Sequence, residues 1–447
     1  MNVFFSIIIF LFYVSICNDL VSSLVESSEA SRVEIFGSGA SFPGQIYMHI
    51  TFSRNFGSHE KAYYTSVGSG AGIRAIQEDE VDFAGSDKIL SPEDYSAFPD
   101  LQMYPTMAGA VAVYHNLDSV RVGGTQLVLS REVLPRIFLG DISFWNDPEI
   151  AELNPTISLP NEKINVIVRA AHSGTTQIFT KGLTSFSEDF AERIGVQSLP
   201  DWCESVNTTV SFTKTAGSLT YTCQTCIKGA LQSEFTVCYV PHWAIFNIIS
   251  LDPYSIGYFS YIPFGDDREV QTASMINRAG TIVNPSSESV SYAVMELGGL
   301  LNERFNAELI DASSTHAWPL VDYTYLIMKK QTQTRSCQVR RAVLDFWVWF
   351  YTSDPVREML SEAGFAALPK FIADFVMEKL VTDIQCVSNQ GLLFPAYLNT
   401  TEGLSYLFLT SDSLADDLKI FNYAYTSLIT ETVDWESYSY SSMMMLG

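Results

Sequence analysis

The sequence predicts an α/β fold built around a parallel β-sheet. Short runs of β-branched and aromatic residues alternate with segments of helical periodicity, and glycine-rich and serine-rich turns separate them. Strands that alternate with helices indicate a parallel sheet, whose ligands bind at the carboxyl ends of the strands. The 447 residues are 47% hydrophobic and 17% charged, which is enough chain and apolar surface for two or three domains with a buried core.

In the first part of the chain, each predicted strand ends in a turn of small polar residues. The predicted strands cover residues 33–36, 63–67 and 81–84, and predicted helices cover residues 43–55 and 73–78. The turns are Gly37-Ser38-Gly39, Gly68-Ser69-Gly70-Ala71-Gly72 and Gly85-Ser86-Asp87. The repetition predicts that three similar turns meet at one edge of the sheet.

The same pattern returns later in the chain. A strand over 164–168 leads through the turn at 169–174 into a helix that begins at Thr175. Further strands are predicted over 256–261 and 323–328, and further helices over 337–351 and 355–363. Residues 200–240 lack clear periodicity and carry four cysteines, so we expect a surface insertion held by disulfides.

The first residues are typical of a signal peptide. The apolar block from Val3 to Val14 is too short to span a bilayer comfortably, and Ser15 and Cys17 supply small residues for cleavage. We therefore predict that residues 1–17 are removed and that the protein is exported, to the extracellular space or, in a bacterium, to the periplasm. A lipid anchor on Cys17 is the alternative.

The remaining cysteines number six: Cys203, Cys223, Cys226, Cys238, Cys337 and Cys386. An even number in an exported chain predicts disulfides, although six cysteines allow 15 pairings. The cluster from Cys203 to Cys238 offers zinc as an alternative, but it lacks a second C-x-x-C pair. Sequons at Asn207 and Asn399 suggest glycosylation on a eukaryotic secretory route.

The charge balance limits the partners. The formal net charge is −24, and a strongly acidic chain is a poor partner for nucleic acid, whose phosphates are gathered by basic surfaces. Any bound anion must therefore be held by local groups against the field of the whole protein.

Three of the turns carry groups that suit such an anion. Each places a hydroxyl next to the start of a helix, where unpaired amide N–H groups and the helix dipole favour negative charge. An ordinary N-cap is the simpler interpretation of any single turn. Taken together, three turns, a cation and a carboxyl group suit one tetrahedral oxyanion. The candidate ligand-binding residues are Ser41, Phe42, Ser69, Asp87, Arg169, Ser173, Gly174 and Thr175.

Catalytic and metal sites have weaker signals. Gly37-x-Gly39 and Gly68-x-Gly70 begin like a dinucleotide fingerprint, but Phe42 and Ile73 stand where the third glycine is needed. The chain has no G-x-S-x-G elbow, and its six histidines are scattered. We therefore expect a binding protein without catalytic residues, metal or cofactor.

The turns and several later segments resemble the substrate-binding proteins of bacterial phosphate ABC transporters, in the type II periplasmic-binding-protein-like family. The matching segments are Gly37–Pro43, Val67–Ile73, Val81–Asp87, Ile137–Ile142, Trp145–Pro148, Leu153–Pro155, Ser173–Thr176, Ile256–Tyr258 and Ala317–Leu320. They follow the family's order over roughly residues 32–385. The resemblance implies two α/β lobes, joined by a hinge that the chain crosses twice, with the ligand in the cleft between them.

The resemblance also implies a division of the chain and a role for each candidate residue. The first lobe is expected to comprise residues 31–107 and 271–385, the second lobe residues 108–270, and residues 386–447 a C-terminal extension. Ser41, Phe42 and Ser69 match phosphate contacts of the first lobe, and Asp87 matches the carboxylate that accepts the phosphate proton. Arg169, Ser173, Gly174 and Thr175 match the donors of the second lobe.

One position departs from the family pattern. Ala171-His172 stands where family members usually carry Asp-Gly, and that aspartate normally pairs with the arginine. Without it, Arg169 is expected to present a fuller positive charge to the ligand, which puts selectivity for phosphate over sulfate in doubt. His172 either adds a pH-dependent contact or faces solvent.

The resemblance implies capture of phosphate and its delivery to a membrane transporter. Two alternatives stay open: a phosphate-sensing ectodomain of a membrane receptor, favoured by the cysteine-rich insertion, the sequons and the C-terminal extension, and a secreted scavenger or adhesion protein with the same fold.

Overall fold

A computed structural model describes residues 33–56, 60–123, 125–203, 208–228, 233–241, 244–263, 270–332, 334–387 and 393–395. The predicted signal peptide, the asparagines of both sequons and nearly all of the predicted C-terminal extension lie outside these residues. Within them, no helix has the length and hydropathy needed to cross a membrane.

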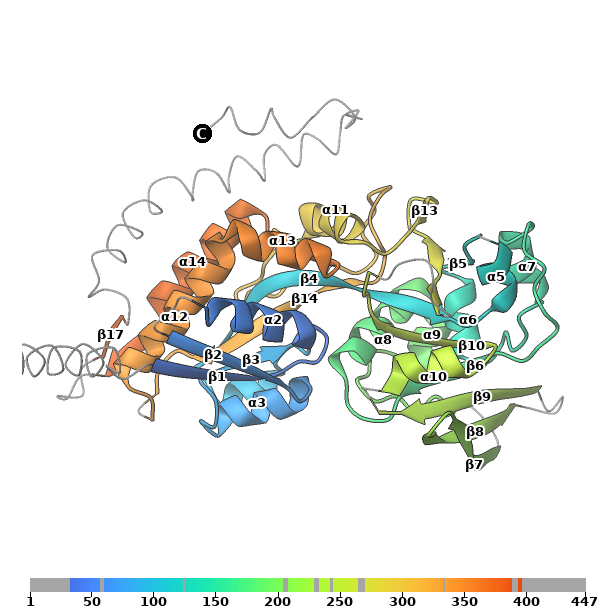
Figure 1. The fold of residues 1–447 in the computed structure, drawn as a ribbon, viewed down its shortest axis with the longest axis horizontal. Helices are drawn as coiled ribbons and strands as arrows, with labels where there is room; N and C mark the ends of the chain where they lie inside the picture. The colour runs from blue at the N-terminus through green and yellow to red at the C-terminus, as the bar shows by residue number, and fades with distance from the viewer. Residues whose placement is uncertain are drawn as a thin grey trace, which may run out of the picture.

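The protein has two α/β lobes that share one 12-stranded mixed sheet (Figure 1). The first lobe holds the strand order β2-β1-β3-β14-β4, and the second continues it as β10-β6-β9-β8-β7. The first-lobe strands are β1 (Val33–Gly39), β2 (Glu60–Ser66), β3 (Phe83–Ser86), β14 (Val321–Lys329) and β4 (Leu101–His115). The predicted α/β class and two-lobed arrangement are confirmed.

Strand β4 joins the lobes. Residues 101–110 of this strand pair with β14, and residues 111–115 pair with β10 (Ser255–Ser260). At the junction, the Val111 amide donates to the Leu320 carbonyl at 2.8 Å, and the Tyr261 amide donates to the Ala110 carbonyl at 2.8 Å. Three segments distant in sequence are thereby held together where the chain passes from one lobe to the other.

The second lobe begins beyond this junction. Its strands are β6 (Asn165–Arg169), β7 (Thr208–Ala216), β8 (Leu219–Lys228) and β9 (Ser233–Val240). Strand β6 pairs in parallel with both β10 and β9. A smaller sheet holds β5 (Val128–Ser130), β12 (Ser274–Ile276) and β13 (Ile282–Val283). Two further strands pair with β4 and complete the twelve of the main sheet: β11 (Gln271–Thr272) at its end and β15 (Phe365–Ala367) at residues 107–109.

Residues 200–240 are more regular than the sequence suggested. Strands β7, β8 and β9 occupy most of this segment, and β9 pairs directly with β6 of the main sheet. These strands, rich in β-branched and hydroxyl residues, form an antiparallel edge of the main sheet, and the placement of the segment as an insertion stays a prediction. The disulfides Cys203–Cys226 and Cys223–Cys238 hold this edge, so the predicted stapling is confirmed and these four sulfurs are not zinc ligands.

A third disulfide, Cys337–Cys386, ties helix α12 (Cys337–Thr352) to strand β16 (Gln385–Val387). Strand β16 pairs with β17 (Leu393–Pro395). This pair lies at the end of the first lobe farthest from the second lobe (Figure 1).

Helices cover both faces of each lobe. In the first lobe, α2 and α12 pack on one face of the sheet and α3 packs on the other (Figure 1). The first-lobe helices that follow the predicted pattern are α2 (Gly44–Arg54), α3 (Ser69–Gln77), α12 and α13 (Asp354–Glu362). Other helices are α4 (Pro92–Ala97), α5 (Asp118–Gly123), α6 (Val133–Phe138), α7 (Pro148–Leu153), α9 (Glu188–Arg193), α11 (Ser287–Leu297) and α14 (Lys370–Asp383).

In the second lobe, α8 (Gly174–Phe186) and α10 (Ile245–Leu251) lie on opposite faces of the sheet. The α8 side belongs to a core that continues into the first lobe, and the stacked rings of Phe179 and Tyr258, 4.1 Å apart, lie in it. The α10 side forms a smaller core with Ile167, Cys223 and Cys238. Helix α8 therefore has one side in a core that both lobes share.

The exchange of the chain between lobes at residues 107–108 and 270–271 stays a prediction. Strand β4 crosses the first of these positions without interruption. Just after the second, β11 and β12 still pair with second-lobe strands, namely the end of β4 and β5.

Candidate functional site

Three parallel strands of the first lobe bring the predicted turns to one edge. Gly39 lies opposite Ser66 of β2 and opposite Gly85 of β3. The Gly39 carbonyl accepts hydrogen bonds from the Val67 and Gly68 amides at 3.0 and 2.8 Å, which joins the first two turns. The predicted meeting of these turns is confirmed by the strand register.

Helix α3 starts earlier than the sequence suggested, at Ser69 rather than at Ile73. Gly68 precedes it with φ of 91°, a left-handed conformation that favours glycine. Gly72 lies so close to β1 that an added Cβ would be 2.4 Å from the Gly39 Cα. These two glycines allow the first turn of α3 to sit directly at the sheet edge.

Ser69 and Asp87 form a buried pair there. The Asp87 amide donates to Ser69 Oγ at 3.1 Å, and the Ser69 hydroxyl donates to Asp87 Oδ2 at 3.3 Å. Ser69 is 3% exposed and Asp87 is 5% exposed. The carboxylate therefore lies at the end of β3 with little access to water.

The second lobe supplies a helix N-terminus and a cation. Ser173 caps α8, because its hydroxyl oxygen accepts a hydrogen bond from the Thr176 amide at 3.3 Å. Arg169 ends β6 and is 6% exposed. Thr176 is anchored in turn by its hydroxyl, which lies 2.8 Å from the Tyr258 hydroxyl.

The two lobes meet at Gly174. A Cβ built on Gly174 would lie 2.6 Å from the Asp87 Cβ, 2.8 Å from Asp87 Oδ2 and 3.1 Å from Ser69 Oγ. The first turn of α8 therefore contacts the Asp87–Ser69 pair across the cleft. Of the eight predicted residues, the structure brings these three into direct contact.

The electrostatics of the site follow from its burial. Burial raises the pKa of Asp87 to about 7; the hydroxyls of Thr324 and Ser69 and the charge of Arg169 act in the opposite direction, and Asp322 adds to the rise. Burial also lowers the pKa of Arg169, while Tyr258 and Asp87 act to raise it. Arg169 is thus close enough to Asp87 for the two charges to interact.

Several polar atoms of the site have no hydrogen-bond partner among the described residues. They are Asp87 Oδ1 and the Nε and Nη1 atoms of Arg169, and all three are buried. Buried polar groups are almost always hydrogen-bonded, since an unpaired one costs about 1–3 kcal/mol. One acceptor on Asp87 and two donors on Arg169, whose charges interact, suit a small ligand that both accepts and donates hydrogen bonds.

The other predicted residues lie in the same loops. Ser41 is half-buried, and its carbonyl accepts a hydrogen bond from the Gly44 amide at the start of α2. The Phe42 ring is buried edge-on against Phe365, 5.4 Å between centroids, so only its backbone can serve a polar ligand. Thr175 is buried in the first turn of α8. Within the described part of the chain, no hydrogen bond joins Ser41, Phe42, Ser173 or Thr175 to Asp87 or Ser69.

His172 is exposed, and its Nδ1 lies 2.9 Å from the Ser198 hydroxyl. The neighbouring Ser173 amide donates to the Ser198 carbonyl at 3.0 Å. Of the two roles considered for His172, the structure favours the solvent-facing one.

Sequence reasoning missed two groups that act on the site. Thr324 and Asp322 both influence the pKa of Asp87 from strand β14. The available signal was a carboxyl and a hydroxyl group within an otherwise apolar strand, which is unusual for a fully buried segment.

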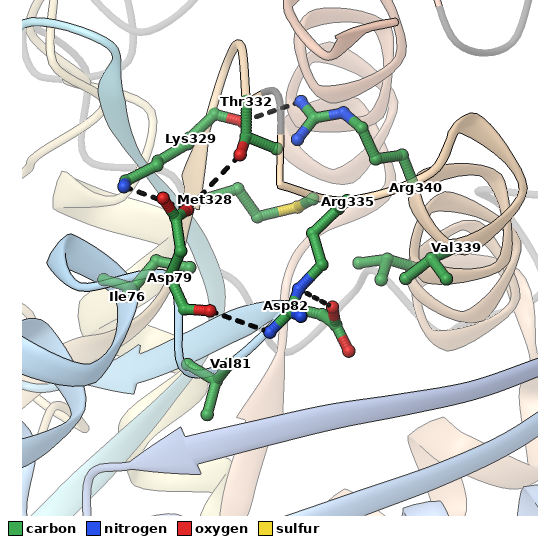
Figure 2. A pocket seen from close by; sticks show the side chains of 11 residues that line it. Ile76, Asp79, Val81, Asp82, Met328, Lys329, Thr332, Arg335, Val339 and Arg340 are labelled. Carbon is green, nitrogen blue, oxygen red and sulfur yellow. Dashed lines mark hydrogen bonds and ion pairs between the residues drawn. The ribbon is translucent and has the colours of Figure 1, made fainter.

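A second cluster of charges, drawn in Figure 2, lies before the start of β3 and at the end of β14, opposite the edge that carries the turns. Here Lys329 pairs with Asp79 at 2.9 Å and Arg335 pairs with Asp82 at 2.7 Å, around a hollow of about 10 Å³. That volume is the size of one water molecule. Since two cations and two carboxylates pair with each other here and the hollow has room for about one water molecule, this cluster is not the ligand site.

Comparison with known proteins agrees with this architecture. The chain is 29% identical over 343 residues to the phosphate-binding protein PstS of Xylella fastidiosa, covering 77% of this chain and 84% of the relative. It is 25% identical over 345 residues to a putative serine/threonine-protein kinase/receptor, R831, of Acanthamoeba polyphaga mimivirus, covering 76% of this chain but 20% of that protein.

Among solved structures, the DING protein superposes with a TM-score of 0.52 at 20% identity, covering 76% of this chain and 93% of that chain. This likeness concerns the fold. The model of a PBP superfamily domain matches residues 25–354, which include the second lobe, most of the first lobe and every candidate site residue. The chain therefore belongs to the PBP superfamily, the family of two-lobed periplasmic-binding-protein folds.

Proposed function

We propose that this protein binds inorganic phosphate in the cleft between its lobes. The observation that carries the proposal is the buried meeting of Asp87, Ser69 and Gly174, together with the interacting charge of Arg169 and polar atoms of Asp87 and Arg169 that have no partner among the described residues. Relatives named as phosphate-binding proteins, such as that of Xylella fastidiosa, support the choice of ligand.

Each part of the site has a task in this proposal. The hydroxyl of Ser69 and the amides at the starts of α3 and α8 donate to phosphate oxygens, helped by the helix dipoles. The guanidinium of Arg169 donates from the second lobe and offsets the ligand's charge. Ser41, the Phe42 amide, Ser173 and Thr175 complete the set of donors.

Asp87 provides selectivity. Phosphate at neutral pH carries a proton that it can donate to the Asp87 carboxylate, whereas sulfate has none. When Asp87 is ionised, sulfate would leave two acceptors facing each other in a buried site, and sites of this kind reject an analogue that lacks the hydrogen by about 10⁴–10⁵. The absence of an aspartate at Ala171-His172 makes this selectivity the part of the proposal most in need of a test.

The proposed role is capture of extracellular or periplasmic phosphate and its delivery to a membrane transporter, without catalysis. Lobe closure fits delivery, since a ligand held by both lobes is released when they separate. Export is expected from the predicted signal peptide over residues 1–17.

Titration calorimetry of the purified protein with phosphate, arsenate and sulfate tests the proposal. We expect binding of phosphate and arsenate, much weaker binding of sulfate, and loss of phosphate binding in Asp87→Ala. Equal affinity for sulfate would remove the selectivity argument, and absence of phosphate binding to the parent protein would remove the function itself.

A second candidate is a phosphate-sensing receptor ectodomain. It is favoured by the match to the mimivirus kinase/receptor, in which a segment like this chain makes up a fifth of a longer protein. An immunoblot of native cells with an antibody against the two lobes discriminates the roles. A band near 50 kDa supports the transporter role, and a much larger membrane-bound band supports the receptor.

A further inference from the structure

Helix α8 contacts the first lobe at a second point beyond the anion site. Lys181 follows Gly174 by seven residues, nearly two helical turns, so the two residues lie on the same side of the helix. The Lys181 ammonium pairs with Asp322 Oδ2 at 3.0 Å. Asp322 belongs to strand β14 of the first lobe, as Asp87 belongs to the turn after β3.

The Asp322 carboxylate is the buried partner of this lysine. Its side chain is 5% exposed, and its Oδ1 accepts the Tyr323 amide at 2.8 Å. Lys181 also pairs with Glu308 at 2.8 Å, but the Glu308 side chain is 59% exposed. A buried ion pair that loses one member leaves an uncompensated charge, whereas an exposed pair contributes little.

The pair lies next to the junction between the lobes. A Cβ on Gly182 would be 2.1 Å from Leu320 Cδ2, so α8 packs tightly against the segment that precedes Asp322. The Leu320 carbonyl accepts the Val111 amide where β4 passes between lobes. Helix α8 thus runs from this junction to the cleft, with Lys181 near one end and Gly174 at the other.

Asp322 also acts on the anion site through its charge. It raises the pKa of Asp87, which means that the two carboxyl groups are close enough to repel each other. A bound anion beside Asp87 would meet the same repulsion. Lys181 offsets this charge directly, since it is paired with Asp322.

We propose that Lys181 is a positioning residue for the anion site, which holds the N-terminus of α8 against Asp87 through its ion pair with Asp322 and neutralises that carboxylate behind the ligand. This inference rests on the proposed binding of phosphate. It assigns to the site a lysine that contacts no ligand and acts through another residue.

Calorimetry with inorganic phosphate on the parent protein, Lys181→Gln, Lys181→Arg and the double variant Lys181→Gln/Asp322→Asn tests this role. Lys181→Gln should weaken phosphate binding about tenfold or more, because it leaves Asp322 charged and unpaired. Lys181→Arg should stay within about threefold of the parent, because it keeps the charge. The double variant should bind more tightly than Lys181→Gln, because it removes the repelling carboxylate.

The matched control is Lys163→Gln, which breaks an exposed lysine–glutamate pair with Glu234 in the second lobe, 2.8 Å long. It should leave phosphate affinity within about twofold of the parent. Thermal melts of every variant establish that it is folded. If Lys181→Gln does not fold, the double variant alone tests the inference. Its phosphate affinity is expected to be about three- to tenfold below that of the parent.

Several results would overturn the inference. One is a phosphate affinity of folded Lys181→Gln within twofold of the parent. Another is a double variant whose phosphate affinity either does not exceed that of Lys181→Gln or equals that of the parent. The last is a loss of phosphate affinity in Lys163→Gln as large as that in Lys181→Gln. Failure of the parent protein to bind phosphate contradicts the proposed function instead, so the two failures are distinguishable.

Discussion

Gly174 lies against Asp87 so closely that no larger residue fits, although the two belong to different lobes. A Cβ at Gly174 would be 2.6 Å from the Asp87 Cβ and 2.8 Å from its Oδ2. Real Cβ atoms do not come this near, so a side chain at this position would have to push the first turn of α8 away from the first lobe. The close contact between the two lobes at this point therefore depends on residue 174 being glycine.

Gly174→Ala is expected to weaken phosphate binding by about 100-fold, equivalent to roughly 2.7 kcal/mol, because the lobes can no longer close on the ligand. Calorimetry measures the loss, and circular dichroism with thermal melting checks that the lobes stay folded. The closed-cleft geometry is contradicted if Gly174→Ala binds phosphate as the parent does.

Asp87 should make the free energy of unfolding depend on pH. Its pKa is raised from 3.8 to about 7 in the folded, ligand-free protein, so the folded state favours the protonated carboxyl group. The folded state therefore gains stability from this group below pH 3.8, the pKa of the same carboxyl group in the unfolded chain, and loses it as the pH rises through 7. Because of Asp87, the free energy of unfolding should be lower at pH 8 than at pH 4 by up to about 4 kcal/mol.

Asp87→Asn removes this titration while keeping the shape of the side chain. Urea unfolding in phosphate-free buffer between pH 4 and 8 should show the variant gaining stability over the parent as pH rises. Asp322, whose pKa burial raises to about 6, titrates in both proteins, so its own burial contributes to both profiles and only its interaction with Asp87 is lost in the variant. Parallel pH profiles for parent and variant would contradict the assignment.

His115 should make the protein sensitive to acid. It is 1% exposed on β4, and neither ring nitrogen has a hydrogen-bond partner among the described residues. Burial lowers the pKa of His115 from 6.5 to about 3, so between these pH values the ring is protonated in the unfolded chain and neutral in the folded protein. Stability contributed by the neutral ring is present above pH 6.5 and falls, by up to about 4 kcal/mol, as pH drops toward 3.

His115→Leu is expected to be at least as stable as the parent at pH 7, because it replaces unpaired buried nitrogens by apolar atoms. Its melting temperature should fall less than that of the parent between pH 7 and 4. A larger fall in the variant than in the parent would mean that the His115 ring is paired.

The Cys337–Cys386 disulfide should stabilise the first lobe without affecting the cleft. It closes a loop with a sequence separation of 49 and joins α12 to β16, far from the α8 N-terminus (Figure 1). Replacement of both cysteines by serine should lower the free energy of unfolding by about 4 kcal/mol. Phosphate affinity at 20 °C below the melting temperature should stay within about twofold of the parent, and a larger change would place this bridge in the path of lobe closure.

Local signals in the sequence predicted the strands and turns that build each half of the site. The register Gly39–Ser66 and Gly39–Gly85 follows from parallel pairing, which the alternation of strands and helices indicated. Strand β4 was missed, since all 15 of its residues are buried and it therefore lacks the alternation that marks a half-exposed strand. The early start of α3 at Ser69 was missed because glycines at 68, 70 and 72 weaken the helical pattern.

The sequence by itself determined the α/β class, the polar turns and the residue types that suit a small anion, because strand and helix periodicity and turn chemistry are properties of neighbouring residues. Only the tertiary structure decided that Gly174 meets Asp87 and that Lys181 pairs with Asp322. Those contacts join residues of different lobes, and their distances depend on how the whole sheet turns at β4. No local pattern encodes that geometry, since it results from packing between segments far apart in the chain.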